Sequence, residues 1–166
     1  GRPVPGVEVR LGDDGEILVR GYTVMAGYLD DPDATAAAID ADGWFHTGDV
    51  GAFDDRGNLR ITDRLTDVFH VGGFNAYPAE IEAAMLRHPA IAQVAVIGVP
   101  DERLGEVGHA FVVPRADARV DADELLAWCR DQMANYKVPR RVTFMDALPQ
   151  TPSGKVQKFA LREAVE

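Results

Sequence analysis

The sequence has little cysteine and no long apolar run, and each shortage excludes a class of protein. Its one cysteine, Cys129, rules out an intramolecular disulfide framework and a zinc site built on several cysteines. No stretch approaches the roughly 20 apolar residues of a membrane-spanning helix. The first ten residues contain no apolar signal-peptide core. We therefore expect a protein of the reducing cytoplasm, with Cys129 as a core thiol.

Charge is unevenly distributed along the chain. The formal net charge is −10, which argues against a general nucleic-acid binder. The three lysines, Lys137, Lys155 and Lys158, all lie in residues 137–166, where 6 basic residues accompany 3 acidic ones. A basic end on an acidic protein indicates a bound anion there, although a solvated surface tail would show the same charges.

The first 62 residues have a β-rich pattern. β-formers on both sides of the turn at residues 12–15 predict a hairpin. A short helix is expected at residues 33–39, with Asp33 as its cap. The expected strands are residues 7–11, 16–20, 44–45, 50–53 and 58–62.

Beyond residue 64 the pattern alternates between strands and helices. Asp121 and Glu124 stand at capping-box spacing before a helix whose apolar stripe includes Cys129. The expected strands are residues 67–71, 91–99, 108–114 and 141–145; the expected helices begin at Pro78 and cover residues 121–134 and 157–165. The predicted fold class is α+β: a small β-rich subdomain at residues 1–64, then a compact lobe at 65–166 whose small sheet is covered by helices.

Residues 151–155 read Thr-Pro-Ser-Gly-Lys. A Pro-Ser-Gly turn leaves backbone N–H groups open and lets one lysine, Lys155, project. Such a turn suits a phosphate or a developing oxyanion. The spacing of a P-loop is absent, and a surface turn before a helix would read the same way.

Two further segments carry polar groups next to glycine turns. In Phe-His-Thr-Gly-Asp at residues 45–49, Asp49 can accept two hydroxyl hydrogen bonds, as a ribose requires; the alternative is a turn-capping aspartate. Arg64 offers a planar fork to phosphate or ribose oxygens. The paired Gly72 and Gly73 allow close approach to the backbone. The alternative for this segment is a linker with a salt bridge, followed by a turn into a helix.

In this order and spacing, the motifs resemble the adenylate-forming enzymes: acyl- and aryl-CoA synthetases, luciferases and peptide-synthetase adenylation domains. The resemblance covers essentially all 166 residues. It is carried by Gly-Glu-Ile-Leu-Val-Arg-Gly at 15–21, Gly-Tyr at 27–28, Thr-Gly-Asp at 47–49, Asp-Arg at 63–64, Gly-Gly-Phe-Asn at 72–75 with Pro-Ala-Glu-Ile-Glu at 78–82, and Pro-Ser-Gly-Lys at 152–155.

The resemblance implies an ATP-dependent acyl-CoA synthetase that works in two half-reactions. A carboxylate attacks Mg-ATP to give an acyl-adenylate and pyrophosphate, and CoA then displaces AMP. Residues 1–64 would be the last β subdomain of a large N-terminal AMP-binding domain, and residues 65–166 the mobile C-terminal domain. The phosphate loop, the adenine site, the acyl pocket and most of the Mg²⁺ site would lie upstream, so we expect the 166-residue piece alone to be inactive.

The resemblance also implies roles for particular residues. Lys155 would be the catalytic lysine, and Asp49 and Arg64 would join it in binding ATP or AMP. Thr66 stands at the hinge position, where the family commonly has Asp or Lys, so the charge interactions of the pivot are not carried over. No metal ligand is expected in this chain. The residues implied for CoA binding are Gly72, Gly73, Phe74, Tyr136, Lys137 and Arg140.

The acyl substrate and the acceptor stay open at this point. Residues 72–78 and 96–106 are more similar to fatty- and steroid-type acyl-CoA ligases than to amino-acid adenylation domains. One alternative is an acyl-AMP ligase that loads a carrier protein. Another is a non-catalytic interaction module of the same fold. The expected partners are the missing N-terminal domain and small molecules: a carboxylic acid, ATP and CoA.

Overall fold

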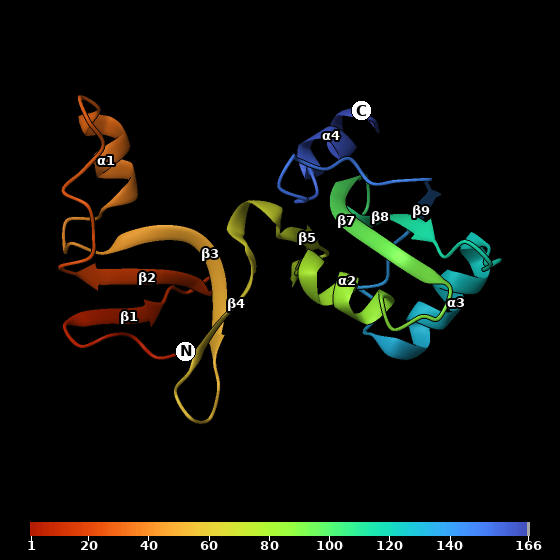
Figure 1. Cartoon of the computed structure of the whole chain (residues 1–166), viewed down its shortest axis with the longest axis horizontal. Helices are drawn as coiled ribbons and strands as arrows, with labels where there is room; N and C mark the ends of the chain where they lie inside the picture. The colour runs from red at the N-terminus through yellow and green to blue at the C-terminus, as the bar shows by residue number, and fades with distance from the viewer. Residues whose placement is uncertain (166) are drawn as a thin grey trace. The chain divides into compact units, whose positions relative to one another are not determined.

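A computed structural model describes residues 1–165 of the chain (Figure 1). The residues form two compact units, 1–66 and 67–166. Each unit has its own sheet, so each is described separately. No helix in the described part of the chain is long and apolar enough to cross a membrane.

The first unit is a four-stranded antiparallel sheet in the order β1-β2-β3-β4, with one short helix. Its core is small and includes the buried Trp44, whose ring centroid lies 4.4 Å from the Arg10 guanidinium and 4.5 Å from that of Arg20. The elements are β1 (Val7–Leu11), β2 (Glu16–Gly21), α1 (Pro32–Ala38), β3 (Phe45–Phe53) and β4 (Leu59–Arg64).

Two details of this unit differ from the sequence prediction. The cap of α1 is Asp31, whose side chain accepts a hydrogen bond from Ala34 N at 2.9 Å, so Asp33 was the wrong choice. Pro32 favours the first helical position, which places the cap one residue before it. The two strands expected at 44–45 and 50–53 are one strand, β3, interrupted by a bulge.

The second unit is built on a five-stranded sheet in the order β6-β5-β8-β7, with β9 parallel to β8. A 3₁₀ turn, η1 (Leu65–Asp67), precedes the first strand. The remaining elements are β5 (Phe69–Val71), β6 (Phe74–Ala76), α2 (Pro78–Met85), β7 (Ile91–Asp101), β8 (Gly105–Pro114), α3 (Ala122–Gln132), β9 (Arg141–Phe144) and α4 (Lys158–Glu163).

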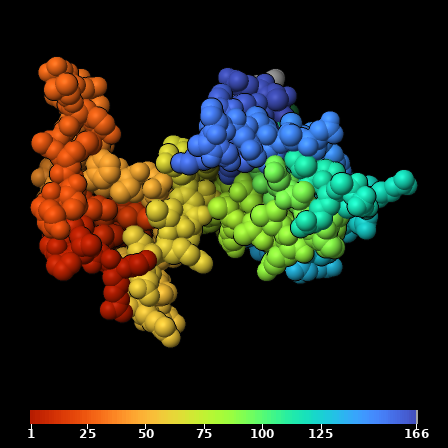
Figure 2. All heavy atoms as spheres, viewed as in Figure 1, coloured from red at the N-terminus to blue at the C-terminus, as the bar shows by residue number. Residues whose placement is uncertain are grey.

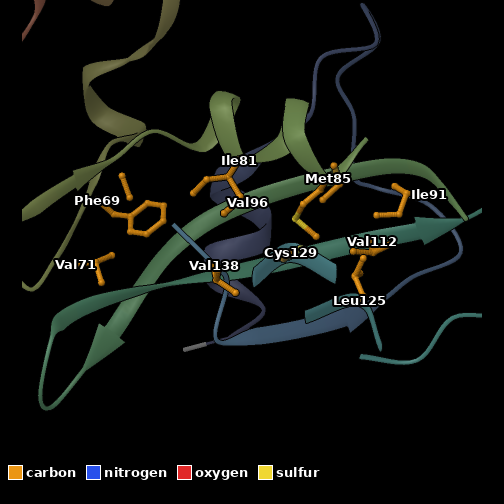
Figure 3. Close-up of a cluster of buried hydrophobic side chains, with 13 residues drawn as sticks. Phe69, Val71, Ile81, Met85, Ile91, Val96, Val112, Leu125, Cys129 and Val138 are labelled. Atoms are coloured by element: carbon orange, nitrogen blue, oxygen red, sulfur yellow. The ribbon is translucent and has the colours of Figure 1, made fainter. Parts of the chain in front are cut away.

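Both faces of this second sheet are covered. On one face α2 and α3 bury an apolar layer that includes Val96 of β7 and Cys129 of α3 (Figure 3). On the other face the chain after β9 contributes Leu148 and Leu161 to a second layer with Ile97. Figure 2 shows this C-terminal segment, in blue, gathered over the unit. Alternate residues of a strand point to opposite faces, so β7 reads as a continuous apolar run.

The α+β class predicted from the sequence is confirmed. Asp121 caps α3 by accepting from Glu124 N at 2.8 Å, as its spacing predicted. Cys129 is a buried core thiol, and burial raises its pKa to about 11. The strand expected at 67–71 begins only at Phe69, because residues 65–67 form the 3₁₀ turn, and the short β6 was not predicted.

Candidate functional site

Lys155 projects from a turn that the backbone holds firmly. Thr151 N donates to Lys155 O at 2.8 Å, and Gly154 N donates to Thr151 O at 2.9 Å. Lys155 N donates to the Thr151 hydroxyl at 3.1 Å. Gly154 has φ +83°, which favours glycine. Lys155 is exposed and forms no ion pair within the described residues, so its ammonium is available to an anion.

Two ion pairs fix the helix that follows this turn. Lys158 Nζ lies 2.8 Å from Glu82 Oε1, which also accepts from Val96 N at 2.8 Å. Arg162 Nη2 lies 2.9 Å from Asp67 Oδ1. The segment that carries Lys155 is therefore attached to α2 and to the start of the second unit. Sequence reasoning missed these partners, because pairs so distant along the chain leave no local pattern.

The paired glycines form the turn between β5 and β6. Gly72 and Gly73 have φ +56° and +87°, the left-handed values that a two-residue hairpin turn of type I′ requires. Gly72 N donates to Leu104 O at 2.8 Å, which ties the turn to the start of β8. In the space around Gly73, an added Cβ would meet no atom within 4 Å, so a ligand can approach the backbone closely.

Three of the predicted CoA-binding residues lie together. The Phe74 and Tyr136 rings stack with centroids 4.9 Å apart and planes 23° apart. Lys137 Nζ lies 5.6 Å from the Tyr136 centroid and 2.5 Å from Glu80 Oε1. Partial burial lowers the pKa of Lys137, but the hydrogen bond and charge of Glu80 outweigh it and raise the pKa above its usual value. Glu80 was not singled out from the sequence.

Arg140 lies directly before β9. Its backbone N donates to Gly108 O at 2.8 Å at the entry to β9. Its side chain is exposed and has no ion-pair partner among residues 1–165. The structure therefore leaves its guanidinium open to solvent anions.

Asp49 and Arg64 are brought together in the first unit. They are directly paired across β3 and β4, and Arg64 Nε lies 3.4 Å from Asp49 Oδ1. The Arg64 side chain is 71% exposed and that of Asp49 28% exposed, so both are open to a ligand. Thr66 follows in η1, at the end of this unit.

A buried carboxylate contacts the residues just before Asp49 and was not singled out from the sequence. Glu16 is only 6% exposed. Its Oε1 accepts from Gly48 N at 2.8 Å, and its Oε2 lies 2.8 Å from His46 Nδ1. Its place in the 15–21 motif was the available signal. No group of three or more potential metal-ligand side chains is assembled within residues 1–165.

Comparison with known proteins gives these features a context. Residues 80–155 match the family model described as AMP-binding enzyme C-terminal domain. The chain is 61% identical over 163 residues to the 3-[(3aS,4S,7aS)-7a-methyl-1,5-dioxo-octahydro-1H-inden-4-yl]propanoyl:CoA ligase of Rhodococcus jostii (strain RHA1), covering 98% of this chain and 32% of that protein. It is 51% identical over 162 residues to a feruloyl-CoA synthase of an Amycolatopsis species, with coverage of 98% and 32%.

A solved structure agrees with the sequence relatives. The crystal structure of ATP-bound MatB from Rhodopseudomonas palustris superposes with a TM-score of 0.92 at 39% identity, over 99% of this chain and 35% of that one. The chain thus spans about a third of the length of the curated relatives it matches. Residues 80–155 therefore carry the AMP-binding enzyme C-terminal domain, and the chain as a whole is similar along 98% of its length to the two CoA ligases and synthases above.

Proposed function

We propose that the whole protein is an ATP-dependent acid–thiol ligase. A carboxylic acid and ATP give an acyl-adenylate and pyrophosphate, and CoA then gives the acyl-CoA and AMP. The observation that carries the proposal is the exposed Lys155 ammonium, unpaired within the described residues and held on a fixed turn of the lobe. A compact cation in that setting suits charge that develops on several oxygens at once.

The names of these relatives support CoA as the acceptor and a ring-bearing acid as the substrate. Both sequence relatives are named as CoA ligases or synthases of ring-bearing acids. We favour a hydrophobic, steroid-type ring acid, because the identity to the inden-4-yl propanoyl:CoA ligase is higher, 61% against 51%. A carrier protein in place of CoA is the competing acceptor.

In the first half-reaction we assign Asp49 to the ribose hydroxyls and Arg64 to ribose or phosphate oxygens. A carboxylate can accept hydrogen bonds from both hydroxyls, and the adjacent guanidinium supplies donors in a planar fork. Lys155 is assigned to the substrate carboxylate and the α-phosphate. Its charge would stabilise the transition state more than the ground state, because negative charge gathers there as the bond forms.

In the second half-reaction the Gly72-Gly73 turn would admit the pantetheine arm at Gly73, where an added Cβ would meet no atom within 4 Å. Phe74 and Tyr136 offer aromatic surface to the CoA adenine. Lys137 and Arg140 offer cations to its phosphates.

The same proposal divides the chain at the hinge. Residues 1–64 would end the large N-terminal domain, and residues 65–166 would turn about Thr66 between the two half-reactions. The two compact units, which meet between residues 66 and 67, support this division.

Mg²⁺ would accompany ATP in this scheme, neutralising charge on its phosphates. The described residues assemble no ligand group for it, so we assign its ligands to the N-terminal domain, which is also the proposed partner of this chain. We propose a cytoplasmic enzyme, in keeping with the single buried cysteine.

Replacing Lys155 in the full-length enzyme tests the proposal. Lys155→Ala is expected to slow pyrophosphate release by about 10²–10³-fold, the usual effect of removing one electrostatic stabiliser. Thioester formation from pre-made acyl-adenylate should be largely spared. Arg119→Ala, which removes another exposed cation of the lobe, should leave both steps unchanged.

Other results would count against the proposal. Equal loss of both half-reactions in Lys155→Ala contradicts the role given to the lysine. A wild-type enzyme that forms no adenylate with any fatty or ring-bearing acid contradicts the ligase. Transfer to a carrier protein but not to CoA identifies the competing acceptor. Residues 1–166 alone are expected to release no pyrophosphate.

A further inference from the structure

The strand β3 bulges beside the Thr-Gly-Asp motif. Across β2 and β3, Leu18 pairs with His46 and Glu16 pairs with Val50. One residue of β2, Ile17, therefore faces three residues of β3. A bulge leaves backbone groups without ladder partners and changes the direction of the side chains that follow it.

The Glu16 side chain accepts hydrogen bonds from groups of the bulge that the β2–β3 backbone pairing leaves without a partner. Its Oε1 accepts from Gly48 N at 2.8 Å and its Oε2 lies 2.8 Å from His46 Nδ1. Gly48 has φ +70°, a left-handed value, so the bulge also needs glycine at this point. Because Glu16 is 6% exposed, both bonds form away from bulk water, where an unpaired carboxylate would be costly.

The neighbouring groups of the bulge are satisfied as well. The Thr47 hydroxyl donates to Ile17 O at 2.7 Å, and Asp49 N donates to the Thr47 oxygen at 3.2 Å. The bulge is thus fastened to β2 by side chains. It ends at Asp49, whose carboxylate faces Arg64 across the strand pair.

We propose that Glu16 is a positioning residue for nucleotide binding: through Gly48 and His46 it fixes the bulge that presents Asp49. The proposal rests on the proposed role of Asp49 at the ribose hydroxyls. Glu16 itself is too buried to meet the nucleotide, so it acts through the backbone of the motif. A carboxamide can replace it, because its oxygen accepts from Gly48 N while its nitrogen donates to the other tautomer of His46.

The test uses three variants of the full-length enzyme. Glu16→Met keeps the size of the side chain but removes both oxygens, whereas Glu16→Gln keeps an acceptor. Glu8→Gln is the matched control, because Glu8 is an exposed carboxylate of the same sheet that pairs with Arg20. Pyrophosphate exchange is measured with ATP and with 2′-deoxy-ATP, so that the contribution of the ribose hydroxyl is read directly.

In Glu16→Met, Asp49 should no longer be held in place to accept from the ribose hydroxyls. We therefore expect KM for ATP to rise about tenfold while kcat stays within about threefold of wild type, the effect of losing one charged hydrogen-bond acceptor for the nucleotide. KM for 2′-deoxy-ATP should rise much less, so the preference for ATP shrinks. Glu16→Gln should stay within about threefold of wild type, and Glu8→Gln should be unchanged. A general loss of structure would instead affect both nucleotides alike.

An unchanged preference for ATP in Glu16→Met, or an equal loss with both nucleotides, overturns the positioning role while the ligase stands. A wild-type enzyme with no exchange activity refutes the ligase itself. If Glu16→Met does not fold, Thr47→Val tests the same bulge, since it removes the acceptor for Asp49 N. It should also weaken the preference for ATP, and an unchanged preference again overturns the proposal.

Discussion

Gly98 and Gly108 leave the space that the Phe69 side chain fills. Gly98→Ala tests how much this packing stabilises the β5–β6 hairpin. The two glycines are paired across β7 and β8. A Cβ added at Gly98 would lie 2.4 Å from Phe69 Cβ and 2.8 Å from Phe69 Cγ, and 3.0 Å from Glu106 Oε1. Phe69 is 1% exposed, so its ring has no room to retreat.

The size of the effect follows from these distances. Carbon atoms pack best at about 3.5–4.0 Å, so the new methyl group overlaps the base of the Phe69 side chain by more than ~1 Å. Overpacking of this kind costs about 1–3 kcal/mol, which corresponds to about 5- to 150-fold in an equilibrium constant. The same change at Gly108 approaches Phe69 Cζ and Pro139 Cα at 3.3 Å, and we expect less than about 1 kcal/mol there.

Native-state hydrogen exchange of the 166-residue chain measures both changes. The slowest amides of β7 and β8 report the opening of the second unit, so they should exchange about 5- to 150-fold faster in Gly98→Ala and much less so in Gly108→Ala. In the full-length enzyme, Gly98→Ala should also slow thioester formation more than adenylate formation, because the hairpin carries Gly72 and Gly73. Equal exchange in the two variants would refute the steric argument.

Two further predictions concern the C-terminal helix and the core thiol. Arg162→Ala removes the ion pair with Asp67, in which the Arg162 side chain is 37% exposed and that of Asp67 21% exposed. We expect the free energy of opening α4 to fall by about 0.5–1 kcal/mol. Hydrogen exchange of residues 158–165 measures this, and unchanged exchange would show that the pair does not hold the helix in place. Because burial raises the pKa of Cys129 to about 11, the unfolded thiol ionises first as pH rises. The free energy of unfolding should therefore fall as pH rises from the pKa of the unfolded thiol to about pH 11. Urea titrations across this range should show a smaller fall with pH for Cys129→Ala than for the wild type. An equal fall in both proteins would contradict the raised pKa of Cys129.

Local chemistry explains why much of the fold was predictable. The spacing of Asp121 and Glu124 predicted the start of α3, and the expected hydrogen bond from Glu124 N to the Asp121 side chain is present. The Gly72-Gly73 pair marks a turn because few other residues tolerate two consecutive left-handed conformations. The apolar run at residues 91–99 indicated a strand, and β7 is that strand. Each of these signals depends only on residues within a few positions of one another.

The contacts around the candidate site could not be predicted in this way. The sequence named Lys155, but the pairs that fasten its segment, such as Arg162 with Asp67, join residues 95 positions apart. The sequence also pointed to Asp49, but not to the bulge in β3 that precedes it. Glu16 was missed as well, because it lies 30 positions before its partner His46. Local sequence patterns do not show such contacts, because they form only after strands and helices from distant parts of the chain have packed together.

The sequence by itself determined the α+β class, the turns and the order of motifs by which the chain resembles the adenylate-forming enzymes. Tertiary structure alone decided which distant groups meet: Glu16 with the backbone of Gly48, and Phe74 with the ring of Tyr136. The physical reason is that turns and caps form from neighbouring residues, whereas burial of a carboxylate or stacking of two rings requires elements from distant parts of the chain to pack first.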